Sequence, residues 1–169
     1  FTFLLYKYES KVEQANGSPI IKMSLFKNGE FVALLVIGVT LYFYQVVMTN
    51  YGILAAIDVL GVSATVAGTL TIPRTIITLI LPTMAGIWIT KKHSNSWLAM
   101  SLASAILIAA FGMLIPISPT MSITMFFIAF SLTGVTESLR AVSILPAAQK
   151  TLSPEQIADG TSLVSFINT

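Results

Sequence analysis

The sequence contains no cysteine, a single histidine and few charged residues. Without cysteine the chain has neither a disulfide framework nor a thiol nucleophile, and one histidine leaves too few nitrogen and sulfur ligands for a structural zinc site. Charged residues make up only 9% of the 169 positions, whereas a typical globular domain has about 25%. These absences exclude a soluble globular fold and a structural metal.

An excess of charge of one sign is also lacking. Nine Lys and Arg residues against seven Asp and Glu residues give a net charge of +2, which is too small for a basic surface that binds nucleic acid. No nucleophile, base and orienting group occur at a spacing that would form a catalytic site. We therefore expect no nucleic-acid partner, no cofactor and no enzymatic activity.

Hydrophobic residues make up 55% of the chain and gather in long runs. A helix that crosses the hydrocarbon core needs about 20 predominantly apolar residues. Four segments meet this requirement, namely 31–57, 62–89, 97–115 and 121–147. Apolar stretches at 1–6 and 160–169 predict the end of an earlier helix and the start of a further one. The sequence therefore predicts a single all-α membrane domain over residues 1–169, cut from a longer protein.

The lysines mark one side of the predicted bundle. All of them fall in the segments 7–30, 90–96 and 148–158, and none falls in the two connections that alternate with these segments. Lysine-rich loops of membrane proteins lie on the cytoplasmic side. The pattern predicts that these three segments are cytoplasmic loops of a multi-pass plasma-membrane protein.

Three charged residues lie inside the spans: Arg74, Glu137 and Arg140. A charge at the centre of a membrane helix costs about 2.5 to 3.5 kcal/mol on insertion scales, so such residues mark functional sites. Glu137 lies within roughly 10 Å of the depth of Arg74, and Arg140 follows it on the same helix as a competing partner. Two interpretations remain open. Glu137 takes up and releases a proton as its partners move, or it pairs permanently and locks the bundle.

Polar and aromatic side chains recur at helical spacing in the first two spans, as expected for the wall of a substrate cavity. One stripe is aromatic and methionine-rich and ends at an acid, a second stripe is polar, and hydroxyl groups flank Arg74. The candidate wall residues are Tyr44, Gln45, Met48, Thr49, Tyr51, Asp58, Thr71 and Thr78. Ordinary helix packing is the alternative interpretation of the aromatic stripe.

The span 97–115 has no charged residue. Ser101, Ala105 and Ala109 follow one another at the small-x-x-x-small spacing that lets membrane helices pack closely. This pattern predicts a peripheral, lipid-facing helix with one packing seam along these three residues.

Three stretches carry a resemblance to a known family. They read ESKVEQANGSPIIKMSLFKNGEF (9–31), LGVSATVAGTLTIPR (60–74) and LPTMAGIWITKK (81–92). Together they resemble the C-terminal half of a major facilitator superfamily transporter, in the fourteen-helix drug:proton antiporter branch. The resemblance implies that the four spans correspond to helices seven to ten of the twelve-helix plan. Gly86, Lys91 and Lys92 then match part of the family's loop motif, while Thr90 stands where the motif has aspartate.

The resemblance implies a secondary active transporter, with proton-coupled multidrug efflux as its function. Its partners would be protons, membrane lipids, a small amphipathic or cationic substrate, and the missing N-terminal half, without which the fragment would not transport. A transporter of another substrate class, such as a lipid-linked molecule or a metabolite, is the first alternative. A structural membrane subunit is the second.

Overall fold

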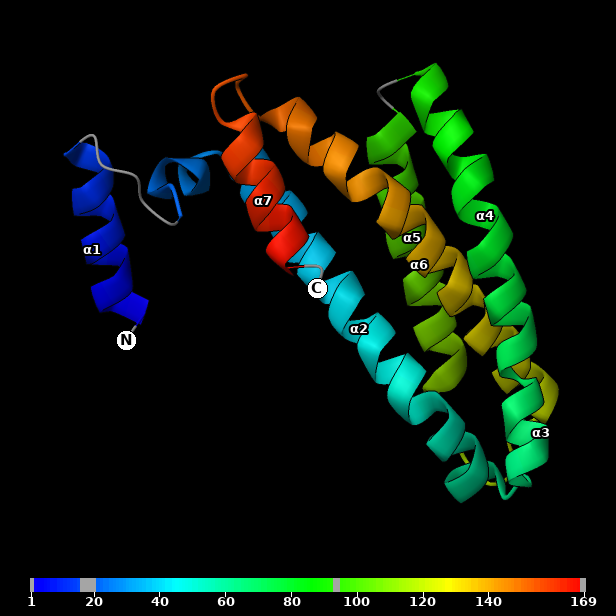
Figure 1. Ribbon diagram of the computed structural model, residues 1–169. Helices are drawn as coiled ribbons and strands as arrows, with labels where there is room; N and C mark the ends of the chain where they lie inside the picture. The colour runs from blue at the N-terminus through cyan, green and yellow to red at the C-terminus, as the bar shows by residue number, and fades with distance from the viewer. Residues whose placement is uncertain (1, 16–20, 93–94, 168–169) are drawn as a thin grey trace. The chain divides into compact units, whose positions relative to one another are not determined.

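The computed structural model describes residues 2–15, 21–92 and 95–167, and this part of the chain is all-helical (Figure 1). Residues 38–144 form one compact unit, and residues 1–37 with 145–169 form another. Part of each predicted loop 7–30 and 90–96, including the single histidine, His93, lies outside the described residues.

Four helical segments are long and apolar enough to cross a membrane. They are α2 (Gly29–Leu60), α3 with α4 (Ala64–Lys91), α5 (Asn95–Leu114) and α6 (Ile123–Thr151). Each predicted span agrees with one of them to within four residues at either end. The structure thus supports a membrane protein, as the hydrophobic runs predict.

The second span is not one helix but two, α3 (Ala64–Thr69) and α4 (Thr71–Lys91), with Leu70 between them. Pro73 has no N–H to donate to the carbonyl four residues earlier, so the helix stops at Thr69 and restarts with the proline in its first turn. Pro82, in contrast, lies inside the continuous helix α4.

The turn between α2 and α3 has a glycine for a stereochemical reason. Gly61 has φ of +66°, a conformation that residues with a Cβ rarely adopt. Its N–H bonds to the Ile57 carbonyl at 3.1 Å and the Val62 N–H bonds to the Ala56 carbonyl at 3.4 Å. This pair of bonds is the Schellman pattern that ends helices, and Ser63 then caps α3 by accepting the Val66 N–H.

The seam predicted for the third span is wrong. Ser101, Ala105 and Ala109 are exposed. The buried face of α5 instead consists of Ser96, Ala99, Met100, Ala103, Leu107 and Ala110. Small residues occur at four-residue spacing on both faces, so the pattern does not decide which one packs. The Thr136 hydroxyl of α6, which donates to the Ala103 carbonyl at 3.4 Å, lies against the buried face.

The segment 7–30 is not simply a loop. The helix α1 (Thr2–Gln14) covers its beginning, and a 3-10 helix, η1 (Met23–Lys27), precedes α2. Glu, Lys and Gln favour helix, which accounts for the extension of α1 beyond the apolar residues. Asn28 caps α2 by accepting the N–H of Phe31, and its side-chain amide donates to the Thr151 carbonyl of α6 at 2.5 Å.

The predicted final helix is present as α7 (Ile157–Ile167), which begins three residues before Gly160. Residues 153–156 form the turn that leads into it, with the Gln156 N–H bonded to the Ser153 carbonyl at 2.9 Å. Val164 on α7 is fully buried.

The exposed lysines Lys91 and Lys92 lie where α4 ends, Lys150 lies in the last turn of α6, and Lys27 lies just before α2. The connections between α2 and α3 and between α5 and α6 contain no lysine.

Candidate functional site

An ion pair joins α4 and α6 in the unit 38–144. Arg74 Nη2 lies 2.6 Å from Glu137 Oε2, and the two side chains are 14% and 24% exposed. The expectation that these residues can meet is confirmed. Glu137 is the central residue of α6, with residues 123–136 on one side and 138–151 on the other. The pair therefore lies near the middle of a helix long enough to cross the bilayer.

Gln45 links Glu137 to the second arginine. Its Nε2 donates to Glu137 Oε1 at 2.7 Å, and its Oε1 accepts a hydrogen bond from Arg140 Nη2 at 2.7 Å. Gln45 lies near the midpoint of α2, between residues 29–44 and 46–60. Arg140 is buried, with 6% exposed. The predicted competition of Arg140 for Glu137 thus takes the form of a bridge in which Gln45 contacts both groups.

Thr49 and two aromatic rings complete the surroundings of the arginines. Arg74 Nη2 also donates to Thr49 Oγ1 at 2.8 Å. The Arg74 guanidinium lies 5.7 Å from the centre of the Phe130 ring, and that of Arg140 lies 5.3 Å from the centre of the Tyr42 ring. Cations favour such positions over aromatic faces. We call Gln45, Thr49, Arg74, Glu137 and Arg140 the charged centre.

Tyr42 and Phe130 were missed by the sequence analysis. Tyr42 lies three residues before Gln45, and Phe130 lies seven residues before Glu137. Both spacings place the aromatic residue on the same helix face as the polar one. Helical spacing from the polar residues Gln45 and Glu137 was therefore a signal that could have identified them.

Gly134 allows α4 to approach α6 closely beside the ion pair. A Cβ atom at this position would lie 3.0 Å from both the backbone oxygen and Cγ of Arg74. A backbone oxygen cannot move aside as a flexible side chain can. Glycine at position 134 therefore accommodates the approach that brings Arg74 next to Glu137, since a Cβ there would require α4 to move by a few tenths of an ångström.

The aromatic stripe of α2 is not part of the charged centre. Tyr44 is buried, and its ring centre lies 4.3 Å from that of Phe111 on α5. Met48 and Tyr51 line a separate apolar cavity of about 280 Å³, together with Phe111. Tyr44 therefore packs between helices, as the alternative interpretation expects. The stripe faces a cavity only from Met48 onward.

The threonines of α4 do not join the network that the structure describes. The Thr71 hydroxyl donates to the Gly68 carbonyl at 2.8 Å, and that of Thr78 donates to the Thr75 carbonyl at 3.0 Å. Hydroxyl groups in membrane helices often satisfy themselves on their own backbone in this way. Thr49 of α2 is thus the candidate threonine that contacts Arg74.

The remaining candidates lie toward helix ends. Asp58 is exposed near the end of α2, and Lys91 and Lys92 are exposed at the end of α4. Gly86 has open space where a Cβ would be placed, since apart from its own helix backbone and chain neighbours no atom of the described residues lies within 4 Å of that position. None of these four residues contacts the charged centre in the described structure.

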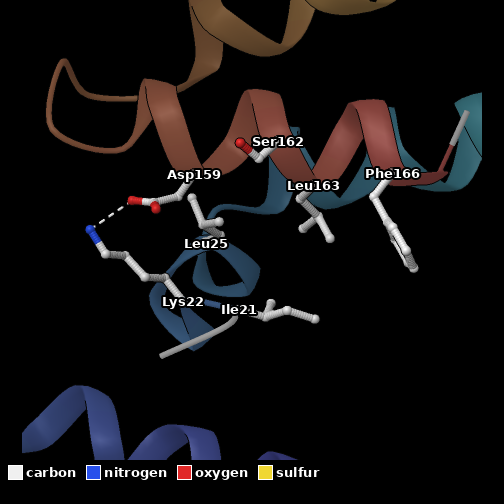
Figure 2. A pocket seen from close by; sticks show the side chains of 7 residues that line it. All are labelled: Ile21, Lys22, Leu25, Asp159, Ser162, Leu163 and Phe166. Carbon is white, nitrogen blue, oxygen red and sulfur yellow. Dashed lines mark ion pairs between the residues drawn. The ribbon is translucent and has the colours of Figure 1, made fainter. Parts of the chain in front are cut away.

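The other unit holds a cavity of about 350 Å³ between η1 and α7 (Figure 2). Lys22 and Asp159 line it and form an ion pair at 2.7 Å, while Leu25 and Leu163 contribute apolar surface. The hydrogen bond and the charge of Asp159 raise the pKa of Lys22 above its ordinary 10.5. This ion pair connects the segment before α2 to the last helix.

Within the described residues, no three His, Asp or Glu side chains lie together as a metal site requires. Comparison of the sequence with protein-family models, curated proteins and solved structures found no match. Function is therefore argued from the charged centre and the helices that hold it.

Proposed function

We propose that this chain is part of a proton-coupled secondary transporter of the major facilitator kind, whose C-terminal half its sequence resembles. The observation that carries the proposal is the Arg74–Glu137 ion pair, linked through Gln45 to Arg140, near the middle of helices long enough to cross a membrane. Ionisable residues at this depth are costly and mark ion or substrate pathways.

The charged centre suits proton coupling because Arg74 has two acceptors. It bonds both to Glu137 and to the Thr49 hydroxyl. A proton on Glu137 removes the charge that attracts Arg74, and Thr49 then still accepts a hydrogen bond from the released guanidinium. Proton uptake and release by Glu137 thereby switch Arg74 between a paired and an unpaired state. The helices that carry these residues move with this switch.

Multidrug efflux across the plasma membrane is the particular activity that the resemblance suggests, with the lysine-bearing connections on the cytoplasmic side. Alternating access needs two halves that rock about a site near the midplane. The activity is accordingly proposed for the protein in which this chain is paired with an N-terminal half. Two guanidinium groups beside one carboxylate favour the alternative of a substrate class other than cations.

A structural membrane subunit is the rival function, and one observation favours it. Both carboxylate oxygens of Glu137 accept a hydrogen bond, one from Gln45 and the other from Arg74. A buried carboxylate whose two oxygens are both hydrogen-bonded can serve to fix the packing of helices rather than to move charge.

The substitution Glu137→Gln separates the two functions, because the amide keeps the shape of the side chain and cannot exchange a proton. Full-length protein is reconstituted in liposomes, and efflux of ethidium, a cation, and of benzoate, an anion, is measured under an imposed pH gradient. We expect Glu137→Gln to abolish pH-driven efflux while insertion stays normal. Glu30→Gln, a matched change at an exposed position at the start of α2, should transport as the wild type does. Efflux retained by Glu137→Gln would support the structural subunit.

A further inference from the structure

The membrane-spanning interior of this chain has an excess positive charge. Within the predicted bounds 31–57, 62–89, 97–115 and 121–147 of the four spans, the charged residues are Arg74, Arg140 and Glu137, which sum to +1. Asp58 lies beyond the first of these segments, exposed near the end of α2. The guanidinium group keeps its charge under all physiological conditions. Taking an unbalanced charge out of water costs several kcal/mol, so a negative group from outside these spans must complete the site.

The carboxylate of Glu137 contacts one of the two arginines directly and is linked to the other through Gln45. Glu137 contacts Arg74 directly at 2.6 Å, whereas Arg140 donates to the neutral amide oxygen of Gln45. Arg74 also has a buried Nε with no hydrogen-bond partner among the described residues. A guanidinium edge with an unused N–H donor is the group that binds carboxylates with two parallel hydrogen bonds.

The neighbours of both arginines favour a ligand with an apolar body. The rings of Phe130 and Tyr42 lie against the two guanidinium groups. Arg74 has 10 residues of the span Ala64–Lys91 before it and 17 after it, so it lies within about two turns of the middle of that span. Lipid headgroups lie at the ends of such a span. A free organic molecule can reach this depth.

We infer that the charged centre binds the carboxylate of an organic acid with an apolar body, and that such an acid is the substrate of the proposed transporter. That the acid is a transported substrate rests on the proposed function, whereas its binding to the charged centre does not. The acid and Glu137 compete for Arg74, because each offers the same carboxylate group to the same guanidinium. Binding of the acid therefore releases Glu137, and a proton on Glu137 favours binding of the acid.

A pair of probes with the same ring and opposite charge tests the inference. Binding of radiolabelled benzoate and of benzylammonium to the full-length protein in detergent is measured by equilibrium dialysis at neutral pH. We expect saturable binding of benzoate and none of benzylammonium. Glu137→Gln removes the competing carboxylate and should tighten benzoate binding at least about tenfold, which corresponds to about 1.4 kcal/mol. Glu30→Gln, the matched control, should bind benzoate as the wild type does.

Substitutions of the arginine check that benzoate occupies this site. Arg74→Gln should weaken benzoate binding at least about tenfold, as expected for loss of a charged hydrogen-bonded partner. Arg74→Lys keeps the charge without the planar fork and should fall between Arg74→Gln and the wild type. Absence of saturable benzoate binding in Glu137→Gln overturns the inference, since the balancing charge then comes from an acidic residue of the other half. Saturable benzylammonium binding that Glu137→Gln abolishes overturns it as well.

The binding experiment uses no proton gradient, so it is independent of the transport assay. If Glu137→Gln binds benzoate more tightly but still transports with the pH gradient, the anion site stands and proton coupling through Glu137 fails. If Glu137→Gln loses transport and binds no benzoate, the proposed transporter stands and the anion site fails.

Discussion

Gln45 has an amide whose two ends meet groups of opposite charge. Its NH2 donates to the carboxylate of Glu137, and its oxygen accepts from the guanidinium of Arg140. A carboxylate at this position would repel Glu137, and an ammonium would repel Arg140. The amide is therefore the group that can stand between both without a net charge of its own.

Replacing Gln45 by leucine should destabilise the protein, because two charged groups each lose a hydrogen bond. We expect Gln45→Leu to lower the free energy of unfolding by about 1 to 3 kcal/mol. The measurement is reversible unfolding in mixed micelles, followed by circular dichroism. Asn50→Leu is the matched control, since the Asn50 side chain is exposed and its amide donates, among the residues that the structure describes, to the Val46 carbonyl of its own helix. Equal losses in both variants would show that the bridge adds nothing to stability.

The Arg74–Glu137 pair should behave as a unit in a double-mutant cycle. Arg74→Ala leaves a carboxylate without its ion-pair partner and should cost about 3 to 5 kcal/mol of folding free energy, while removal of both charges costs much less. We expect the variant with Arg74→Ala and Glu137→Ala to be more stable than Arg74→Ala alone, yet inactive in transport. The same unfolding assay measures Arg74→Ala, Glu137→Ala and the double variant. A double variant no more stable than Arg74→Ala would contradict the pairing.

That Arg74 and Glu137 can meet could be predicted from sequence, because depth in the membrane follows from position along each span. That they do pair depends also on the rotation of α4 and α6 about their axes. The role of Gln45 depends on the rotation of α2 about its axis. Two neighbouring stripes of α2 were candidates for the wall of the cavity. Hydropathy does not decide which of them faces the cavity, because both contain apolar and polar positions. The structure turns Gln45 and Thr49 toward the arginines and buries Tyr44 against Phe111.

At the scale of helices, the contact of α4 with Gly134 of α6 sets how closely Arg74 can approach Glu137. A methyl group there would lie 3.0 Å from the Arg74 backbone oxygen, so α4 must shift. We expect Gly134→Ala to cost about 1 to 3 kcal/mol of folding free energy, the usual range for overpacking, and to impair transport. Gly86→Ala is the matched control, because its Cβ meets no atom and alanine favours helix. Wild-type transport by Gly134→Ala would show that the close approach is unnecessary.

The ion pair between η1 and α7 gives a prediction about pH. Because Asp159 raises the pKa of Lys22, the contact is fully stabilising below the ordinary value of 10.5 and is lost as pH rises through the raised value. Asp159→Asn should return the Lys22 pKa toward 10.5, as measured by NMR titration of the lysine side chain. Glu155→Gln, a change at an exposed acid that makes a smaller contribution, should move it less. An unchanged Lys22 pKa in Asp159→Asn would contradict the ion pair.

The long helices could be predicted from sequence because their existence depends on the length of an apolar run, which bilayer thickness sets. Where a helix breaks and which of its faces packs depend on single residues and on the neighbouring helices. The break at Leu70 follows from Pro73, a single residue whose missing N–H ends one helix and begins the next. The packing face of α5 depends on where α6 places Thr136, and no periodicity within α5 contains that information.

At the scale of the whole molecule, the lysines and the helix directions together predict an orientation in the membrane. Lys91, Lys92 and Lys150 lie at helix ends that lead into connections on one predicted side. The connection between α5 and α6, which has no lysine, belongs to the opposite side. The positive-inside rule assigns the first side to the cytoplasm.

Single cysteines test this orientation cleanly, because the chain contains no cysteine of its own. Ser153 and Thr120 are both exposed, the first in the turn before α7 and the second in the connection between α5 and α6. We expect a membrane-impermeant maleimide to label Thr120→Cys in intact cells and Ser153→Cys only in inside-out vesicles. The same protein without the introduced cysteine controls for background labelling. Labelling of Ser153→Cys in intact cells would reverse the orientation and, with it, the direction assigned to efflux.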